Sequence, residues 1–320
     1  MRLAALLVAA MMATPAMAQA PALATDAVIA LPDTGGRIDH LAIDVKRKHL
    51  FVAELGNGTV DVIDLAARKV IHRIDGLKEP QGIAYEPRSD LVAVASGGDG
   101  TLRLYGAADF KPRGVIKLGD DADNVRVDGR NGHLVVGYGD GALAVIDPAK
   151  AVKLGEVKLP GHPESFRLSG GKVFVNIPDA NQIAVADLDT GRVTGTWIQD
   201  TLRSNFPLML DDAGHVAVVF RSPARLVLFD AVTGKQSVAM DTCGDSDDLF
   251  FDAARKRFYV NCGAGSVDVF AAGDLKALGR VQTRSGARTS LFVPELDRLF
   301  VAERAGLLGH QAAIRVLKPL

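Results

Sequence analysis

Residues 39–54 read DHLAIDVKRKHLFVAE, and residues 288–303 read RTSLFVPELDRLFVAE. Both contain an apolar stretch, a polar turn and a second apolar stretch, and both end in Phe-Val-Ala-Glu. Five further copies of the pattern lie between them, beginning at Gln81, Asp123, Glu164, Phe206 and Asp247. Successive copies begin 41 or 42 residues apart, and a register this constant over seven copies identifies an internal repeat.

Each copy continues with a third apolar stretch and then a weaker, more polar fourth stretch, such as residues 69–75 or 155–159. The third stretches are residues 59–65, 101–105, 142–147, 182–187, 225–230, 266–270 and 313–317. Pairs such as Asn57-Gly58 and Asp99-Gly100 separate the second stretch from the third and are typical of hairpin turns. Four strands in about 42 residues are typical of one blade of a β-propeller.

The last copy has only three strands before the chain ends at Leu320. Residues 26–32, DAVIALP, resemble the missing fourth strand. The sequence therefore predicts an all-β, seven-bladed propeller with four antiparallel strands per blade, in which the N-terminal strand completes the last blade. Such closure leaves no exposed sheet edge. We expect residues 19–320 to form this single domain as a monomer.

Composition excludes some classes of function. The chain has 37 Lys and Arg against 38 Asp and Glu, so no basic excess favours nucleic-acid binding. Residues 1–18, MRLAALLVAAMMATPAMA, are typical of a signal peptide with cleavage after Ala18, so we expect a periplasmic or secreted protein. A membrane anchor is the less favoured alternative, because Thr14-Pro15 interrupts a short apolar run and no later run is long enough to span a bilayer.

Two cysteines remain, Cys243 and Cys262. The repeat places Cys243 just before one strand and Cys262 at the end of the next, at the same end of a hairpin. In an oxidising compartment this arrangement predicts a disulfide. Two reduced, buried thiols are the alternative.

Residues 51–70, FVAELGNGTVDVIDLAARKV, and 173–193, VFVNIPDANQIAVADLDTGRV, resemble the YVTN-type, surface-layer-like β-propeller repeat of exported bacterial proteins. The resemblance extends from Ala24 to Pro319. It implies the propeller fold and export, but not one activity, because most members of that family bind ligands or are uncharacterised, and the same architecture serves lactonases and lyases.

In a propeller the inner strands begin around the mouth of the central channel, where ligands commonly bind. The polar residues expected there form the candidate ligand site: His40, Gln81, Asn124, Arg126, His162, Glu164, Arg167, Asn205, Asp248 and Arg288. Oxygen and imidazole ligands in this set suit a divalent cation (Ca²⁺, Mg²⁺ or Zn²⁺) bound by His40, Asn124, Glu164, Asn205 and Asp248. The alternative is that Asp and Asn at these positions only cap turns.

One repeat position departs from the pattern. The third residue after the start of each inner stretch is apolar in five copies but is Arg126 in the third copy and Arg167 in the fourth. A buried guanidinium needs a partner, so we expect ion pairs with Asp121, Asp123 or Glu164. The alternative is a fork in the channel that grips a carboxylate or phosphate.

The chain has no H-E-x-x-H, G-x-S-x-G or C-x-x-C-H motif, so the sequence assigns no catalytic residue and no certain cofactor. We therefore expect an exported, non-catalytic propeller that binds a small ligand, a metal ion or a periplasmic protein partner at the channel mouth. The alternative is a metal-dependent, lactonase-like hydrolase or lyase, with Glu164 or Asp248 as base and His40 or His162 as acid or ligand. An accessory role in a redox system is a third possibility.

Overall fold

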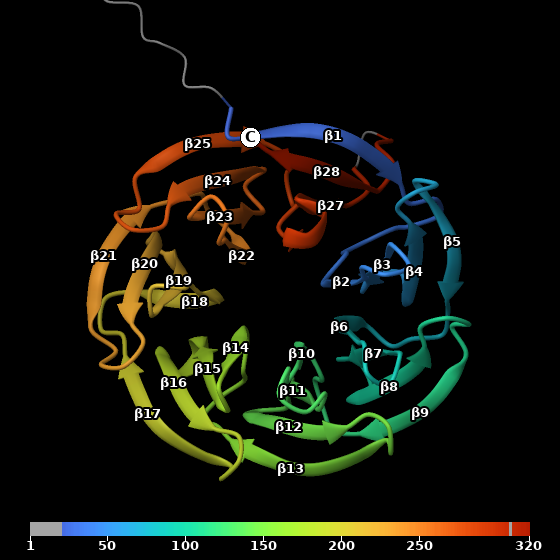
Figure 1. Ribbon diagram of the computed structural model, residues 1–320, viewed down its shortest axis with the longest axis horizontal. Coiled ribbons are helices and arrows are strands. Elements are labelled where there is room, and N and C mark those ends of the chain that lie inside the picture. Colours follow the sequence, from blue (N-terminus) through green and yellow to red (C-terminus); the bar gives the residue numbers. More distant parts are fainter. Residues whose placement is uncertain (1–20, 307–308) are drawn as a thin grey trace, which may run out of the picture.

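The computed structural model describes residues 21–306 and 309–320. These residues form seven four-stranded sheets arranged in a ring around a common axis (Figure 1). In six of the sheets, four consecutive strands pair antiparallel, with the first strand innermost and the last at the rim; in the seventh, β1 is the rim strand. The predicted all-β, seven-bladed propeller is confirmed.

Each blade corresponds to one copy of the repeat. The strands of blades 1 to 3 are β2 (Leu41–Asp44), β3 (His49–Glu54), β4 (Thr59–Asp64), β5 (Lys69–Ile74), β6 (Pro80–Glu86), β7 (Leu91–Ser96), β8 (Thr101–Gly106), β9 (Pro112–Lys117), β10 (Val125–Val127), β11 (Leu134–Tyr138), β12 (Ala142–Asp147) and β13 (Val152–Lys158). Those of blades 4 and 5 are β14 (Phe166–Ser169), β15 (Lys172–Ile177), β16 (Gln182–Asp187), β17 (Arg192–Ile198), β18 (Arg203–Leu210), β19 (His215–Ser222), β20 (Ala224–Asp230) and β21 (Gln236–Asp241). Those of blades 6 and 7 are β22 (Ser246–Asp252), β23 (Arg257–Cys262), β24 (Ser266–Ala271), β25 (Ala277–Gln282), β26 (Ser290–Val293), β27 (Arg298–Glu303), β28 (Ala313–Pro319) and β1 (Leu23–Ala30). Two 3₁₀ turns, η1 (Pro178–Ala180) and η2 (Pro294–Leu296), replace ordinary turns in blades 4 and 7.

Blade 7 is completed by the N-terminal strand, as predicted. β1 pairs antiparallel with β28, from Leu23 opposite Pro319 to Ala30 opposite Ala313, and lies at the rim beside it (Figure 1). The strand begins three residues before the predicted range 26–32, and its pairing continues to Leu31, whose N–H donates to the Ala312 carbonyl at 2.9 Å. This pairing closes the ring and covers the outer edge of β28.

The hydrophobic core is divided among the seven spaces between neighbouring blades. Each of the seven apolar clusters draws its residues from two adjacent sheets. The middle strands alternate side chains toward the blade on either side, so β7 (Leu91–Ser96) is buried along its whole length. The outer strands are more exposed because one of their faces meets solvent. Their weaker apolar pattern in the sequence has this cause.

The predicted disulfide is confirmed. Cys243 and Cys262 lie at bonding distance, with 5.9 Å between their Cα atoms, and Cys262 pairs in register with Ser246 at the start of β22. Both cysteines are buried in the cluster between blades 5 and 6. The bond therefore links the loop that enters blade 6 to the end of its second strand.

The predicted signal peptide, residues 1–18, lies outside the described residues. In the part of the chain that the structure describes, no helix has the length and apolar character needed to cross a membrane.

Candidate functional site

Three adjoining spaces lie along the axis of the ring. A mouth cavity of about 20 Å³ lies at the face where the inner strands begin, a channel cavity of about 390 Å³ lies among those strands, and an exit pocket of about 730 Å³ lies where they end. His40 lines both the mouth cavity and the channel cavity. The channel cavity and the exit pocket share Ile43, Tyr85, Leu291, Phe292 and Pro294, so these two spaces meet.

The mouth cavity is mostly polar and the channel cavity mostly apolar. The mouth cavity is lined by Arg37, Asp39, His40, Asp123, Asn124, Glu164, Ser165, Phe206 and Asp247. The channel cavity is lined by His40, Leu41, Ala42, Ile43, Ile83, Ala84, Tyr85, Val125, Arg126, Val127, Arg167, Met209, Asp248, Phe250, Phe251, Ser290, Leu291, Phe292 and Pro294.

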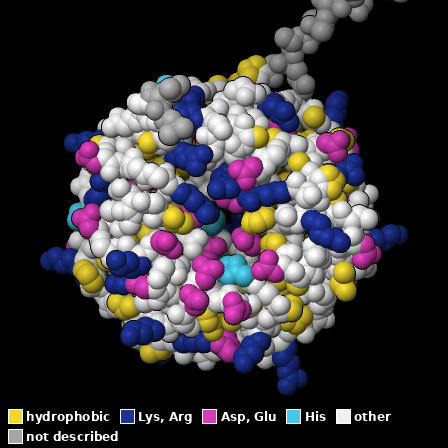
Figure 2. Space-filling view, turned by 180° about the vertical axis from the view of Figure 1, so that it is seen from behind, with side chains coloured by type: hydrophobic (Ala, Val, Ile, Leu, Met, Phe, Trp, Pro, Cys, Tyr) yellow, Lys and Arg dark blue, Asp and Glu magenta, His cyan; other side chains and the backbone are white. Residues whose placement is uncertain are grey.

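The mouth gathers carboxylates from several blades. Figure 2 shows Asp and Glu side chains around the central opening, with histidine among them and Lys and Arg side chains close by. Gly82 allows the close approach of two blades here, because a Cβ atom at this position would lie 2.0 Å from the Asp123 carbonyl oxygen. Close backbone packing against blade 2 thus fixes the position of Asp123.

Crowding and burial shift the titration of these acids. Burial, opposed by Arg37, raises the pKa of Asp39 to about 6, and burial reinforced by Asp39 raises the pKa of Asp247 to about 6. Burial together with the charges of Asp123 and Asp247 raises the pKa of Glu164 to about 8. Glu164 is therefore mostly protonated at neutral pH, which lowers the repulsion within the cluster.

His162 supplies positive charge beside these acids. Its Nδ1 lies 2.7 Å from the Gly139 carbonyl oxygen, and its ring nitrogens lie 3.6 Å from Asp121 and 3.9 Å from Asp123. Burial lowers the pKa of this imidazole, but Asp123, the Gly139 carbonyl and Asp121 together raise it to about 9. These neighbours therefore favour the protonated form of His162.

The expected ion pairs of Arg126 and Arg167 are not formed, and that prediction is wrong. Among the described residues, no carboxylate oxygen lies within 4.0 Å of either guanidinium. The inner strands explain the difference: Asp123 and Glu164 precede the arginines by three residues, or about 10 Å along a strand. The carboxylates therefore line the mouth, whereas the arginines line the channel cavity below it.

Neutral groups hold the two guanidinium groups in place. Arg126 donates to the Val125 carbonyl at 2.8 Å and to Asn124 Oδ1 at 2.8 Å, and it lies 5.6 Å from the centre of the Phe166 ring. Arg167 donates to the Phe166 carbonyl at 3.0 Å and approaches the Met209 sulfur at 3.2 Å. These contacts orient the arginines without neutralising them.

The charge in the channel cavity is incompletely balanced. Burial lowers the pKa of Arg126, and burial together with the charge of Arg126 lowers the pKa of Arg167 to about 9. Asp248 is the one carboxylate lining this cavity among the described residues, and its Oδ2 accepts the Ser290 N–H at 2.6 Å. Burial raises the pKa of Asp248 to about 6, despite the nearby His40.

The structure brings most, but not all, of the predicted site residues together. His40, Asn124 and Glu164 line the mouth cavity, and Arg126, Arg167 and Asp248 line the channel cavity. His162 lies beside the mouth through its contacts with Asp121 and Asp123.

Besides His162, three predicted residues line neither space. Gln81 donates to Asp121 at the surface, and Arg288 is paired with Asp245 at 2.9 Å. Asn205 is fully buried and donates to Asn176 Oδ1 and the Gln182 carbonyl between blades 4 and 5. Sequence reasoning missed Tyr85, Phe292 and Ser290, which line the channel cavity. A signal for the first two is present, since aromatic residues stand at corresponding positions of their repeats.

The predicted cation site has no preformed ligand cage. In residues 21–306 and 309–320, no group of three or more His, Cys, Asp and Glu side chains is arranged to hold a metal ion. The mouth cavity, at about 20 Å³, has room for one water molecule or small ion. Asp123 Oδ1 is buried there without a hydrogen-bond partner.

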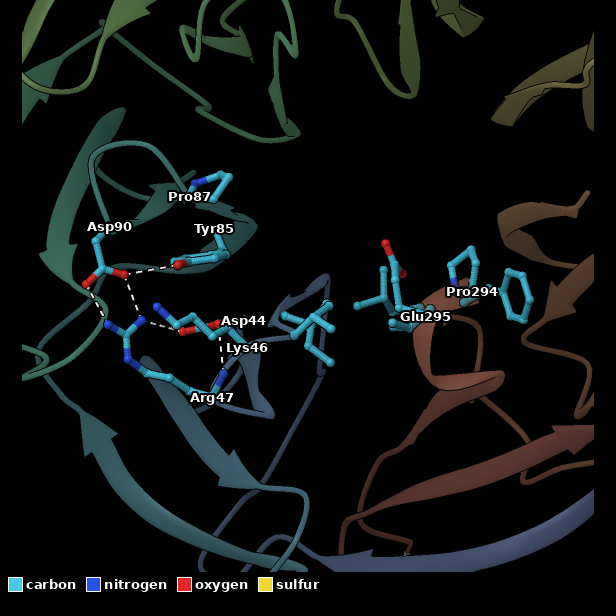
Figure 3. A pocket seen from close by; sticks show the side chains of 13 residues that line it. Asp44, Lys46, Arg47, Tyr85, Pro87, Asp90, Pro294 and Glu295 are labelled. Atoms are coloured by element: carbon cyan, nitrogen blue, oxygen red, sulfur yellow. Dashed lines mark hydrogen bonds and ion pairs between the residues drawn. The ribbon is translucent and has the colours of Figure 1, made fainter.

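The exit pocket lies between blades 1, 2 and 7. Arg47 pairs with Asp44 of its own blade and with both oxygens of Asp90 in the next, and the Tyr85 hydroxyl donates to Asp90 at 3.0 Å (Figure 3). Pro294 and Glu295 stand on the opposite wall (Figure 3). Lys46 and Glu295 also line the pocket and have no ion pair among the described residues, so the pocket offers exposed charge as well as the apolar surface of its deeper residues.

Comparison with known proteins shows the fold but no family. No protein-family model matches the chain, and no curated protein matches it in sequence. Among solved structures, the chain resembles one titled Kuenenia stuttgartiensis hydrazine synthase, with a TM-score of 0.76 and 15% identity over 88% of this chain and 97% of that one. At this identity the likeness shows that the chain is a seven-bladed β-propeller.

Proposed function

We propose that this protein is an exported binding protein whose axial channel holds a small ligand. The observation that carries the proposal is the pair Arg126 and Arg167, which face a cavity of about 390 Å³ without a carboxylate partner. Desolvated charge of this kind is unfavourable unless another group compensates it. A bound ligand is the group that the cavity has room for.

Export is supported by the features of the chain that suit an oxidising compartment. Residues 1–18 have the pattern of a signal peptide, and Cys243 and Cys262 lie at disulfide distance. The resemblance to YVTN-type repeats also favours export, because that repeat is typical of exported bacterial proteins, most of which bind ligands or are uncharacterised.

The ligand enters from the exit pocket rather than through the mouth. The mouth cavity has room for little more than one water molecule, whereas the exit pocket has a volume of about 730 Å³ and meets the channel cavity. The site therefore lies deeper than the mouth itself, and the mouth carboxylates close one end of the channel.

The test is a thermal-shift screen of the purified protein with charged and neutral small molecules, repeated on two variants. Ala84→Leu narrows the channel cavity, which Ala84 lines, and Ala253→Leu adds the same side chain at an exposed turn. We expect compounds that raise the Tm of the wild-type protein to do so in Ala253→Leu and to lose their effect in Ala84→Leu. If every shift survives Ala84→Leu, the channel is not the binding site.

A metal-dependent, lactonase-like hydrolase or lyase is the second candidate. It is favoured by Asp123 Oδ1, which is buried without a hydrogen-bond partner at a cavity of ion size. In this proposal His40, Asn124, Glu164 and Asp248 rearrange around a Ca²⁺, Mg²⁺ or Zn²⁺ ion. Elemental mass spectrometry of protein purified without chelator, with melting in EDTA, tests it. Stoichiometric bound metal, together with a lower Tm when EDTA removes it, supports the enzyme. Absence of bound metal, with no change in Tm when metal ions are added, rejects it.

A further inference from the structure

The channel cavity is built from unequal contributions of the seven blades. At the equivalent position of the inner strands, blades 1 and 2 carry Ala42 and Ala84, whereas blades 3 and 4 carry Arg126 and Arg167. The small side chains of blades 1 and 2 leave space along the axis, and the long cationic side chains reach in from the next two blades of the ring. A ligand lying beside the alanines would therefore meet both guanidinium groups.

Both arginines retain unused donors for such a ligand. A guanidinium has five N–H donors, and the contacts with Val125, Asn124, Phe166 and Met209 use two on each arginine. The acceptors among these contacts are neutral, so they fix the orientation of the groups and leave the charge unmatched. Two adjacent, oriented guanidinium groups suit the paired oxygens of a carboxylate or sulfonate.

The charge count limits the ligand to a single negative charge. The cavity presents two arginines against Asp248, whose Oδ2 is already held by the Ser290 N–H. His40 also lines the cavity, and one additional negative charge balances this set when Asp248 is ionised and the His40 ring is neutral. A doubly charged group such as sulfate would exceed the balance in a space that is largely apolar.

The remaining lining excludes a wholly polar ligand. Level with the arginines the cavity is bounded by Phe250 and Leu291. One residue further along the inner strands it is bounded by Val127 and Phe292, and it continues past Tyr85 into the exit pocket. Phe250 and Phe292 are 8% and 7% exposed, so they form the wall of the cavity and not a surface patch. Burial of an apolar body against this wall removes apolar surface from water and so favours binding.

We propose that the channel ligand is a monoanion with a carboxylate or sulfonate head between Arg126 and Arg167 and an apolar body directed toward the exit pocket. This inference rests on the proposed function and specifies the chemistry of the same site. The fork accepts the head, the space beside Ala42 and Ala84 accepts the first carbons, and the exit pocket accommodates bodies of different length.

Isothermal titration calorimetry tests the proposal with octanoate, octanamide, octylammonium, acetate and inorganic sulfate as probes. We expect octanoate to bind at least tenfold tighter than octanamide, acetate or sulfate, and octylammonium not to bind. Arg126→Gln and Arg167→Gln should each lower the affinity for octanoate at least tenfold and change the affinity for octanamide by no more than about threefold. Arg192→Gln, a change on the exposed outer strand β17, should leave every affinity unchanged.

The outcomes distinguish failure of the anionic ligand class from failure of the proposed function. If octanamide or octylammonium binds as tightly as octanoate and Ala84→Leu abolishes that binding, the channel is a ligand site but the anionic class is refuted. If sulfate or acetate matches octanoate, the role of the apolar body is refuted. If no probe and no compound of the screen responds to Ala84→Leu, both the ligand class and the proposed function are rejected.

Discussion

Two arginines of this propeller should respond to the same substitution with changes of opposite sign. Arg167 lines the channel cavity without an ion pair, whereas Arg221 lies near the mouth with its Nη2 2.6 Å from Asp247 and its Cζ 3.6 Å from the centre of the Phe206 ring. We expect Arg167→Met to stabilise the ligand-free protein and Arg221→Met to destabilise it. The difference depends only on whether the charge has a partner.

The stability change expected for Arg167→Met follows from the environment of the guanidinium. Its pKa, lowered to about 9, lies far below that of a solvated guanidinium, and 1.36 kcal/mol per pH unit sets an upper limit of about 5 kcal/mol on the cost of the charge. The side chain keeps some contact with solvent in the channel, which reduces the expected gain to about 1–3 kcal/mol. Methionine fits here because the equivalent position of the next blade is Met209.

The magnitude for Arg221 has the opposite sign. Removing Arg221 takes away the cation nearest to the mouth carboxylate Asp247, and the ring of Phe206 loses its contact with the guanidinium. We expect a loss of about 1–2 kcal/mol, moderated by protonation of Asp247, whose pKa is already about 6.

Urea unfolding at pH 7, followed by fluorescence and circular dichroism, measures both changes against wild type. Arg192→Met provides the control, since an exposed substitution should change stability by less than about 0.5 kcal/mol. A decrease of 1 kcal/mol or more in the free energy of unfolding of Arg167→Met would refute the reasoning. It would show that Asp248 already compensates the charge of this arginine in the free protein.

Three further outcomes can be measured. Because Asp39, Asp247 and Glu164 have raised pKa values, the folded state binds more protons than the unfolded state, so the free energy of unfolding should fall as pH rises from 5 to 9. Urea unfolding should show a weaker pH dependence in Glu164→Gln. A rise in wild-type stability over that range would contradict the prediction. Replacing Cys243 and Cys262 together with Ser should cost about 3 kcal/mol, from a closed loop of 19 residues, and a thiol assay of the denatured, unreduced protein should find no free thiol; two thiols would disprove the bond. Because Asp248 has a pKa of about 6, octanesulfonate, which stays ionised, should bind more weakly at pH 7.5 than at pH 5. Asp248→Asn should increase the affinity for octanesulfonate about tenfold at pH 7.5, or 1.4 kcal/mol, and reduce its pH dependence. The other titratable or charged groups that face this carboxylate are Arg126, Arg167, His40 and Asp247. Equal affinity in Asp248→Asn and wild type would show that Asp248 does not act on the ligand.

The repeat predicts the ring and the closing strand because both depend on period and apolar alternation. A period of 41 or 42 residues fixes the blade, and the missing fourth strand in the last copy requires a partner from the other end of the chain. The position of the disulfide follows in the same way, because cysteines on neighbouring strands of one blade meet if the register is known.

The candidate site is less predictable because the inner strands begin irregularly. The pairing shifts between Asn205 and Leu208, between Pro80 and Ile83, and between Ser246 and Asp248. A bulge turns the side chains within it away from the direction that simple alternation predicts. Asn205 consequently lies between blades 4 and 5, and Gln81 lies at the surface, although both stand at the expected place in the repeat.

The failed ion-pair prediction has a different cause. Carboxylates are frequent in the sequence around Arg126 and Arg167, but proximity in sequence does not place them at the same depth along the axis. Asp123 and Glu164 lie one layer above the arginines and interact with the mouth residues instead. Sequence identified the unusual residues correctly, and only the layering of the inner strands shows that they are unpaired.

A sevenfold scaffold makes such departures informative. Most inner positions carry side chains that pack the axis, and the fold would be satisfied by an apolar residue at each of them. We expect two arginines without ion pairs to reduce the stability of the free protein, and the two alanines of the preceding blades leave space beside them. Each change alone is a packing defect, but together they form a space with a charged end and an apolar end. The same residues that weaken the empty propeller are therefore those from which a ligand would recover the lost free energy on binding.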